Sequence, residues 1–133
     1  MAGYSGRPLV EKLGLKAAQR LALVGAPGGF ARELEPLPAG VRLGAGRGPL
    51  DCVLLFAPDA ATLTGGFPRW AARLTPAGML WVAWPKKAAK IATDLDENVV
   101  RRIGLAAGLV DVKVCAVTEV WSGLKFVRRL RDR

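Results

Sequence analysis

Short apolar runs alternate along this chain with segments of helical spacing. Runs at residues 20–25, 51–56 and 79–84 are almost wholly apolar, which is typical of strands buried on both faces of a sheet. A briefer strand is predicted at 41–43. Because helical segments separate these runs, the pattern predicts an α/β fold with a mostly parallel sheet.

Two short helices are predicted, one before the apolar run at 20–25 and one after it. The first covers residues 9–13; it begins near Pro8, which suits a first helical position, and it ends at Gly14. The second covers residues 30–35 and stops where two prolines follow. Both helices are expected to pack against the sheet through their apolar residues.

A longer helix is predicted after the strand at 51–56. Asp59 is its predicted N-cap, because a carboxylate there can accept a hydrogen bond from a free backbone amide. Gly65, Gly66 and Pro68 are expected to interrupt or kink this helix. It is then expected to resume through residues 70–74.

The strongest helix signal lies at residues 94–107. Thr93 is the predicted N-cap, and Gly108 is the predicted C-cap. Glu97 and Arg101 are spaced to form an i, i+4 ion pair on the polar face. The opposite face has an apolar stripe formed by Leu95, Val99, Ile103 and Ala106.

The C-terminal segment has a different hydrophobic pattern from the strands before it. Apolar and polar residues alternate over 110–116, which predicts a half-exposed strand near a sheet edge. Residues 121–123 are expected to turn the chain into a last strand at 124–127 that is antiparallel to its predecessor. With strands numbered in chain order and right-handed crossovers, the pattern predicts a three-layer sandwich with sheet order 2-1-3-4-6-5. Only the last strand is expected to be antiparallel.

Length and composition indicate one ordinary globular domain, residues 1–133. No apolar run approaches the roughly 20 residues needed to cross a bilayer, and residues 1–10 lack a signal-peptide core. We therefore predict a cytoplasmic protein without a membrane partner. Cys52 and Cys115 lie in apolar strand patterns and are expected to be reduced core thiols. The sequence has no histidine, so no metal site and no histidine-based catalysis is predicted.

The amino-acid composition and net charge add little about the function of the protein. A single Asn, a single Gln and an excess of 13 Arg over 7 Lys suit a thermophile, although a codon bias toward Ala, Gly, Arg and Pro would have the same effect. The net charge is +9, of which +2 falls in residues 1–66 and +7 in residues 67–133. Such a charge favours an anionic partner. A basic solvated surface explains it equally well, because the dense basic run is confined to the tail at 128–133.

A glycine-rich loop follows the first strand. It contains Gly25, Pro27, Gly28 and Gly29, and backbone amides in such loops bind anions at the carboxyl ends of parallel strands. The loop lacks the G-x-G-x-x-G spacing, Pro27 has no N–H to donate, and a simple tight turn is the alternative. The second strand ends in Leu-Gly-Ala at 43–45, so the acid that holds a ribose in nucleotide-binding folds is missing.

A second candidate site follows the strand at 79–84. This strand ends in Trp84 and Pro85 and opens into a loop with Lys86 and Lys87. The loop closes at the residues Thr93 and Asp94. The lysines are either anion ligands or solvated charges, and the acids after Thr93 are either functional or only helix-capping. Trp121 is expected in the hairpin turn, at the opposite end of the sheet or on a rim.

Several motifs together resemble a small bacterial family, domain of unknown function 3052. The matching segments are Tyr4-Ser-Gly6, Pro8-Leu-Val10, Val82-Ala-Trp-Pro-Lys-Lys87, Thr93-Asp-Leu-Asp-Glu-Asn98, Gly108-Leu-Val-Asp-Val-Lys-Val114 and Trp121-Ser-Gly-Leu-Lys-Phe126. This resemblance implies no particular activity. The order of elements is also similar to the Rossmann-like methyltransferases that use S-adenosylmethionine, and Leu74-Thr-Pro-Ala-Gly78 resembles their Leu-x-Pro-Gly-Gly turn. That resemblance implies a Rossmann-like fold with a cofactor crevice at the strand ends.

Three functions remain open at this point. The first is a non-catalytic module that binds an anionic or phosphorylated small molecule at the strand ends, through the loop amides of Gly28 and Gly29 with Lys86 and Lys87. The second is a small or degenerate methyltransferase. The third is a module that binds nucleic acid or protein through the basic C-terminal half, although exposed aromatic residues among the basic ones are few. The sequence does not identify a cofactor, an oligomeric state or whether the protein is an enzyme.

Overall fold

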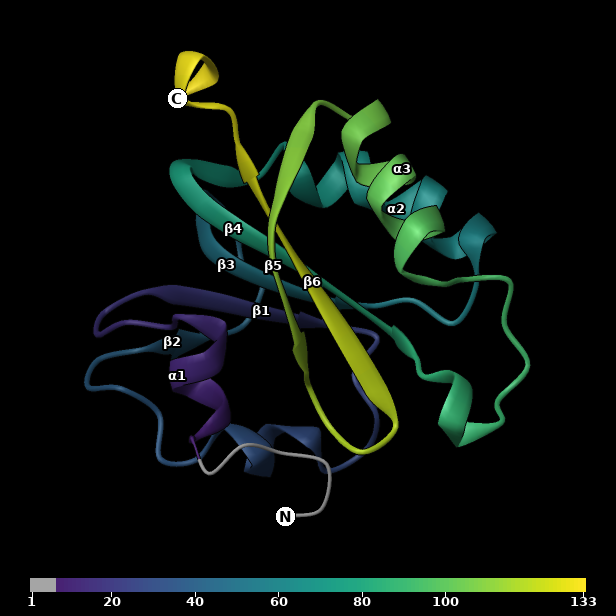
Figure 1. Ribbon diagram of the computed structural model, residues 1–133. Helices are drawn as coiled ribbons and strands as arrows, with labels where there is room; N and C mark the ends of the chain where they lie inside the picture. Colours follow the sequence, from purple (N-terminus) through teal and green to yellow (C-terminus); the bar gives the residue numbers. More distant parts are fainter. Residues whose placement is uncertain (1–6) are drawn as a thin grey trace.

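A computed structural model describes residues 7–133 and contains one six-stranded sheet between two layers of helices (Figure 1). The sheet order is β2-β1-β3-β4-β6-β5, as predicted. β1, β2, β3 and β4 pair in parallel, whereas β6 is antiparallel to both of its neighbours. The strands are β1 (Arg20–Val24), β2 (Arg42–Leu43), β3 (Leu50–Phe56), β4 (Leu74–Pro85), β5 (Leu109–Ala116) and β6 (Trp121–Arg128).

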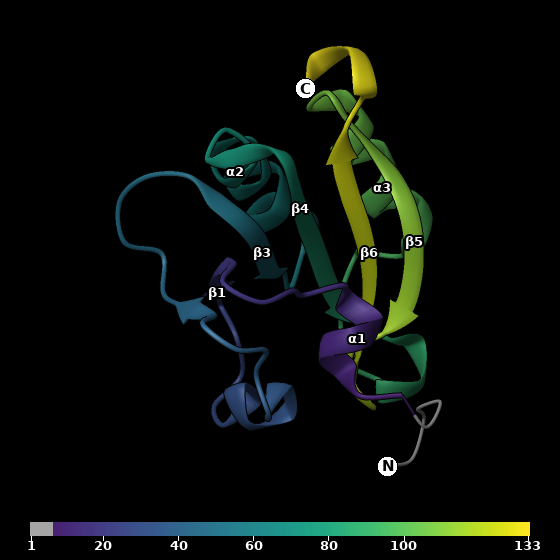
Figure 2. The ribbon, with the colours of Figure 1, turned by 90° about the vertical axis from the view of Figure 1, so that its left-hand side faces the viewer.

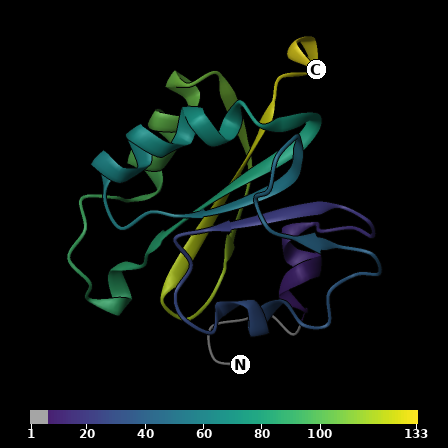
Figure 3. The same cartoon turned by 180° about the vertical axis from the view of Figure 1, so that it is seen from behind.

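The helices divide between the two faces of the sheet. α2 (Ala60–Ala71) and α3 (Glu97–Ala106) cover one face, and α1 (Leu9–Leu13) covers the other together with the 3-10 helix η1 (Phe30–Leu34) (Figures 2 and 3). Two further 3-10 helices are η2 (Lys87–Ala89) and η3 (Leu130–Asp132). Within residues 7–133, no helix combines the length and the apolar character that crossing a bilayer requires.

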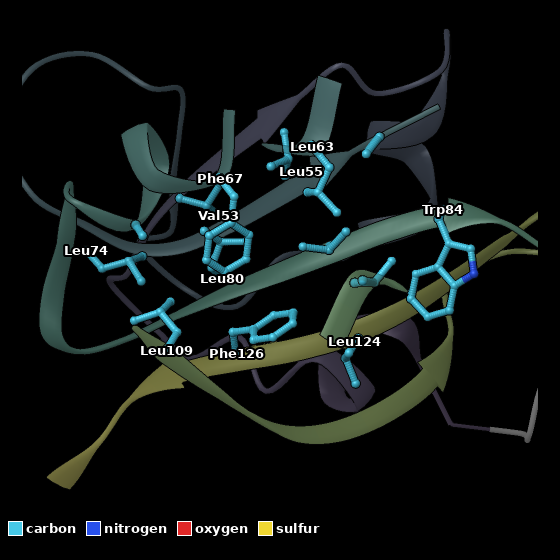
Figure 4. Packing of buried hydrophobic residues seen from close by; sticks show 14 of the residues in the cluster. Val53, Leu55, Leu63, Phe67, Leu74, Leu80, Trp84, Leu109, Leu124 and Phe126 are labelled. Atoms are coloured by element: carbon cyan, nitrogen blue, oxygen red, sulfur yellow. The ribbon is translucent and has the colours of Figure 1, made fainter. Parts of the chain in front are cut away.

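The core consists of two clusters separated by the sheet. The α2/α3 face buries a continuous apolar layer that runs from Leu74 and Phe67 to Phe126 and Trp84 (Figure 4). The α1/η1 face buries Trp81, Cys52 and their neighbours. Burial raises the pKa of the Cys52 thiol to about 12, so this cysteine is a protonated core residue, as predicted. Cys115 is a free thiol too, but only partly buried.

The helix after β3 is continuous up to Ala71, so of the predicted interruption or kink the interruption is wrong, and Leu74 belongs to β4 instead of the helix. Asp59 is its N-cap as expected, because its carboxylate accepts a hydrogen bond from Thr62 N at 2.8 Å. The helix then runs through Pro68 without a break, burying Leu63 and Phe67 against the sheet. This packing outweighs the low helix propensity of the glycines and proline, which propensity alone does not reveal.

The last helix starts later than predicted. α3 begins at Glu97, and its N-cap is Asp96, whose carboxylate accepts from Val99 N at 2.8 Å, so the assignment of Thr93 as the cap is wrong. The predicted ion pair between Glu97 and Arg101 is present, and Arg101 also donates to Asp111 of β5 at 2.8 Å. The helix ends one residue earlier than predicted, with Ala107 as its C-cap.

The hairpin turn also differs from the prediction. The chain reverses over residues 117–120, and Trp121 already belongs to β6. Thr118 explains the position of the turn, because its hydroxyl accepts hydrogen bonds from Val120 N at 3.0 Å and Trp121 N at 3.1 Å. Gly123 is needed within the strand rather than in a turn, since a Cβ there would lie 2.7 Å from the Val117 side chain.

The strand β4 begins five residues before the predicted start. Pro76 and Gly78 are turn-forming residues by type, but they lie in an irregular stretch of the strand where the register with β3 shifts. Pro has no N–H for the ladder and is tolerated at such irregularities. A Cβ on Gly78 would lie 2.9 Å from the Thr75 hydroxyl, so the close approach of the backbone requires glycine there.

Candidate functional site

The carboxyl ends of β1, β3 and β4 lie at one edge of the sheet, where the sequence places both candidate loops. Because β6 is antiparallel to β4, its first residue reaches the same edge, and Trp121 pairs with Pro85. Of the two expected positions for Trp121, the one at the opposite end of the sheet is therefore wrong. The antiparallel direction of the last strand, which the sequence pattern predicts, leads to this position once Trp121 is placed in the strand rather than in the turn.

A cavity of about 580 Å³ opens at this edge. Three segments form it: the glycine-rich loop after β1, the start of η1, and the turn between β5 and β6. Of the predicted site residues, Pro27, Gly28 and Gly29 line it. The lining that sequence reasoning missed consists of Phe30, Glu33, Thr118, Glu119, Val120 and Trp121.

Two glycines of the glycine-rich loop, Gly25 and Gly29, have left-handed backbone, Gly29 with a φ of +80°, whereas Gly28 does not. Gly25 has a φ of +68°, and a Cβ there would lie 3.0 Å from the carbonyl oxygen of Phe56 in β3. A side chain at this position is therefore excluded by both backbone conformation and space. A Cβ on Gly28 or Gly29 would meet no atom within 4 Å, so the backbone of both residues faces open space at the cavity.

Aromatic rings support the cavity from the sheet side. Phe56 packs edge-on against Phe30, with centroids 4.8 Å apart, and against Trp121, with centroids 5.1 Å apart. These edge-to-face contacts hold the two lining rings on one buried strand residue. The cavity wall thus offers a rigid aromatic surface between the loop and the hairpin turn.

The charges around the cavity do not suit an anion. In the described part of the chain its lining includes the carboxylates of Glu33 and Glu119 but neither Lys nor Arg. Both side chains are exposed, so their negative charge disfavours an anion moderately rather than strongly. The polar groups here therefore favour a neutral or positively charged ligand group over a phosphate.

The structure does not bring the lysines of the second loop into this cavity lining. Lys86 N donates a hydrogen bond to Val120 O at 2.8 Å, which joins the end of β4 to the hairpin turn. Lys87 is exposed at the start of η2. Trp84 is buried on the α2/α3 face, among the core residues shown in Figure 4. Pro85 is buried beside Trp121.

Thr93 and Asp94 fasten the long loop to the amino terminus of α2. The Thr93 hydroxyl donates to Pro58 O at 2.7 Å and accepts from Leu95 N at 3.1 Å. The Asp94 carboxylate accepts from Ala60 N at 2.8 Å, next to the Asp59 cap. Two carboxylates therefore satisfy free amides at the positive end of one helix. These contacts support the fold-stabilising interpretation of the Thr93–Asp94 motif.

The described residues do not fit an adenosine cofactor. A ribose would need a side-chain acceptor at the carboxyl end of β2. This strand ends at Leu43 and pairs only with Arg20 and Leu21, so it stops short of the carboxyl end of β1 at Val24. The loop after β2 is instead wrapped around guanidinium groups. Arg73 Nη2 donates to the carbonyl oxygens of Ala45, Gly46 and Gly48 at 2.6, 3.0 and 2.8 Å.

The sheet order and the C-terminal hairpin define the Rossmann-like fold of S-adenosylmethionine-dependent methyltransferases. No protein-family profile and no curated protein sequence matches the chain. The fold is therefore established by solved structures of low sequence identity, which show the architecture alone.

Three of these structures illustrate the likeness. The magnesium protoporphyrin IX methyltransferase of Synechocystis PCC 6803 matches with a TM-score of 0.63 and 13% identity, over 91% of this chain and 74% of that one. A SAM-dependent methyltransferase of Aquifex aeolicus matches with a TM-score of 0.61 and 14% identity, over 89% and 86%. A protein of Bordetella parapertussis described as a possible exported protein matches with a TM-score of 0.63 and 15% identity, over 90% of this chain and 64% of that one.

Proposed function

We propose that this protein is a non-catalytic module that binds a small molecule between the glycine-rich loop and the β5–β6 turn. The observation that carries the proposal is the cavity of about 580 Å³ at the carboxyl edge of the sheet. Its size is within the range of small-molecule sites, and ligands of open α/β folds bind at this edge. The absence of histidine from the sequence removes the commonest general base from any catalytic alternative.

The lining supports a ligand with an apolar or aromatic body. Phe30 and Trp121 offer ring surface, and the open backbone of Gly28 permits close approach. The carboxylate of Glu119 favours a neutral or cationic polar group on that body. This ligand class replaces the phosphorylated one that the loop lysines suggested, because those lysines do not line the cavity.

Filling the cavity is the direct test. Gly28→Leu places a side chain where nothing lies within 4 Å, so it blocks the site without a clash in the fold. Native mass spectrometry of the freshly purified wild type is expected to show a retained ligand, and the variant is expected to lose it. Gly65→Leu is the matched control, because Gly65 also faces open space but lies in α2. Equal ligand retention in Gly28→Leu would contradict the proposal.

The alternative is a degenerate S-adenosylmethionine-dependent methyltransferase, which the fold of the solved structures favours. Isothermal calorimetry separates the two functions. We expect no binding of S-adenosylmethionine or S-adenosylhomocysteine tighter than about 100 μM, roughly −5.5 kcal/mol, because β2 presents no ribose acceptor. A micromolar isotherm that Gly28→Leu abolishes would establish the cofactor site instead.

Membership of the bacterial family that the motifs indicate is part of the same proposal. The matching motif at Trp84–Lys87 joins β4 to the hairpin turn, and the motif at Thr93–Asn98 holds the loop to α2. The first motif therefore supports the turn that lines the cavity, whereas the second stabilises the start of α2. The match at Tyr4-Ser-Gly6 lies outside the residues that the structure describes.

A further inference from the structure

Lysine side chains gather on the α1/η1 face, away from both predicted loops. Lys113 of β5 pairs directly with Lys125 of β6 across the antiparallel ladder. Like charges in directly opposed positions destabilise a strand pair, so this arrangement has a cost in the isolated protein. Neither residue belongs to the cavity lining described above.

The end of α1 brings further basic groups to the same place. Lys113 Nζ donates to the carbonyl oxygen of Lys12 at 2.9 Å, and Lys12 Nζ donates to Ala116 O at 2.9 Å. A Cβ on Gly14 would lie 3.6 Å from Lys125 Nζ, so the Lys125 ammonium rests against the backbone just after α1. The two strands and the helix end therefore hold these ammonium groups in fixed positions.

Lys125 is the centre of this cluster. Its side chain is half-buried, whereas Lys113, opposite it on β5, and Lys16, two residues beyond Gly14, are exposed. Burial lowers the pKa of Lys125, and the positive charges of Lys113 and Lys16 lower it further. Among residues 7–133, no hydrogen bond is formed by the Lys125 ammonium, which leaves its donors available to a ligand.

We propose that Lys16, Lys113 and Lys125 form a binding site for a single oxyanion, such as the phosphate group of a small molecule. The anion would relieve the repulsion across the β5–β6 pair and accept charge-assisted hydrogen bonds from the Lys125 ammonium. The cluster lies on the paired segments of β5 and β6 beside the end of α1, whereas the basic tail continues beyond the end of β6 (Figure 1). A compact site suits a small anion better than the extended backbone of a nucleic acid, which needs basic groups along a track.

Inorganic phosphate is the probe, titrated at constant ionic strength while the side-chain ε-CH₂ signals of the lysines are followed by NMR. The wild type is expected to bind phosphate with the largest shift at Lys125, and the pKa of Lys125 is expected to rise when the anion is present. Lys125→Met keeps the length of the side chain but removes its charge, and it is expected to weaken phosphate binding by about tenfold or more. Lys16→Met is the second variant. Because Lys16 is exposed, this substitution is expected to leave the fold intact.

Lys90→Met is the matched control, because Lys90 is exposed in the loop after β4. It is expected to bind phosphate like the wild type. The proposed site would be overturned if Lys125→Met and Lys16→Met both bound phosphate with the affinity of the wild type. It would also be overturned if the wild type did not bind phosphate. Tight binding of a single-stranded oligonucleotide without binding of phosphate would overturn it in favour of a nucleic-acid surface. Because Gly28→Leu leaves these lysines untouched, its effect on the cavity ligand is judged separately.

Discussion

The two faces of the sheet are covered in different ways. On the α2/α3 face, two helices press an apolar layer together so tightly that a Cβ on Gly104 would lie 2.1 Å from the ring of Phe126. On the α1/η1 face, a five-residue helix and a 3-10 helix cover the sheet partly through polar contacts. Trp81 Nε1, for example, donates to Leu13 O at 2.9 Å.

The two faces therefore have different roles in the protein. The tightly packed face supplies stability. The thinly covered face holds Phe30 and Trp121 of the cavity and also the lysine cluster. Ligand sites tend to lie where packing is incomplete and polar groups remain accessible.

The largest effect is expected from Gly104→Ala on the packed face. A methyl group there overlaps the Phe126 ring, so α3 must move away from the sheet. We expect a loss of about 3 kcal/mol or more in the free energy of unfolding, measured by urea denaturation. Gly65→Ala in α2 is the control, since it meets no neighbour and is expected to stabilise by about 0.5–1 kcal/mol. Equal effects of the two changes would show that the packed face is looser than described.

A smaller effect is expected from Trp81→Phe on the thinly covered face. The change removes the buried indole N–H and leaves the carbonyl of Leu13 without this donor. We expect a loss of about 1–3 kcal/mol, with faster amide hydrogen exchange in α1. Trp84→Phe removes the same atoms on the other face, and it is expected to leave exchange in α1 unchanged. An unaltered α1 in Trp81→Phe would contradict the role of polar contacts on this face.

Asp94→Ala is expected to have a smaller effect on stability than Trp81→Phe. The carboxylate accepts from Ala60 N at the start of α2, so its removal resembles the loss of a helix cap. We expect a loss of about 1 kcal/mol in thermal or urea unfolding. Lys90→Ala, in the same loop but exposed, is the control and is expected to change little. A stable Asp94→Ala variant that lost ligand binding would return this residue to a functional role.

The smallest effect is expected from the double change Lys86→Ala with Lys87→Ala. Neither side chain lines the cavity, and we expect a change within about 0.5 kcal/mol. Phosphate is expected to raise the melting temperature above that in chloride at equal ionic strength, and the double variant is expected to keep that difference. Loss of the difference in the double variant would place the anion at the end of β4 rather than beside Lys125.

Much of the fold was predictable because its signals are local. The apolar runs that became β1, β3 and β4, the cap at Asp59 and the pair of Glu97 with Arg101 all depend on neighbours in the sequence. The exceptions are equally instructive. Pro68 predicts a break that packing of Phe67 prevents, and Thr93 has the side chain of a cap but bonds to Pro58 instead.

Only one part of the candidate site, the glycine-rich loop, was predictable from the sequence. The glycine-rich loop is visible as a motif, because the left-handed backbone at Gly25 requires glycine. Trp121 and Glu119 complete the cavity, yet they lie far from that loop in the sequence. Their pairing with it depends on the antiparallel direction of β6.

By itself the sequence determined which segments become strands and helices, since hydrophobic spacing and capping residues act over a few positions. The tertiary structure alone decided which side chains meet. It buried Trp84, turned Lys86 into a backbone link to Val120, and set Lys125 opposite Lys113. The physical reason is that the register between strands and the contacts of distant side chains arise from the joint packing of separate segments, and no single segment encodes them.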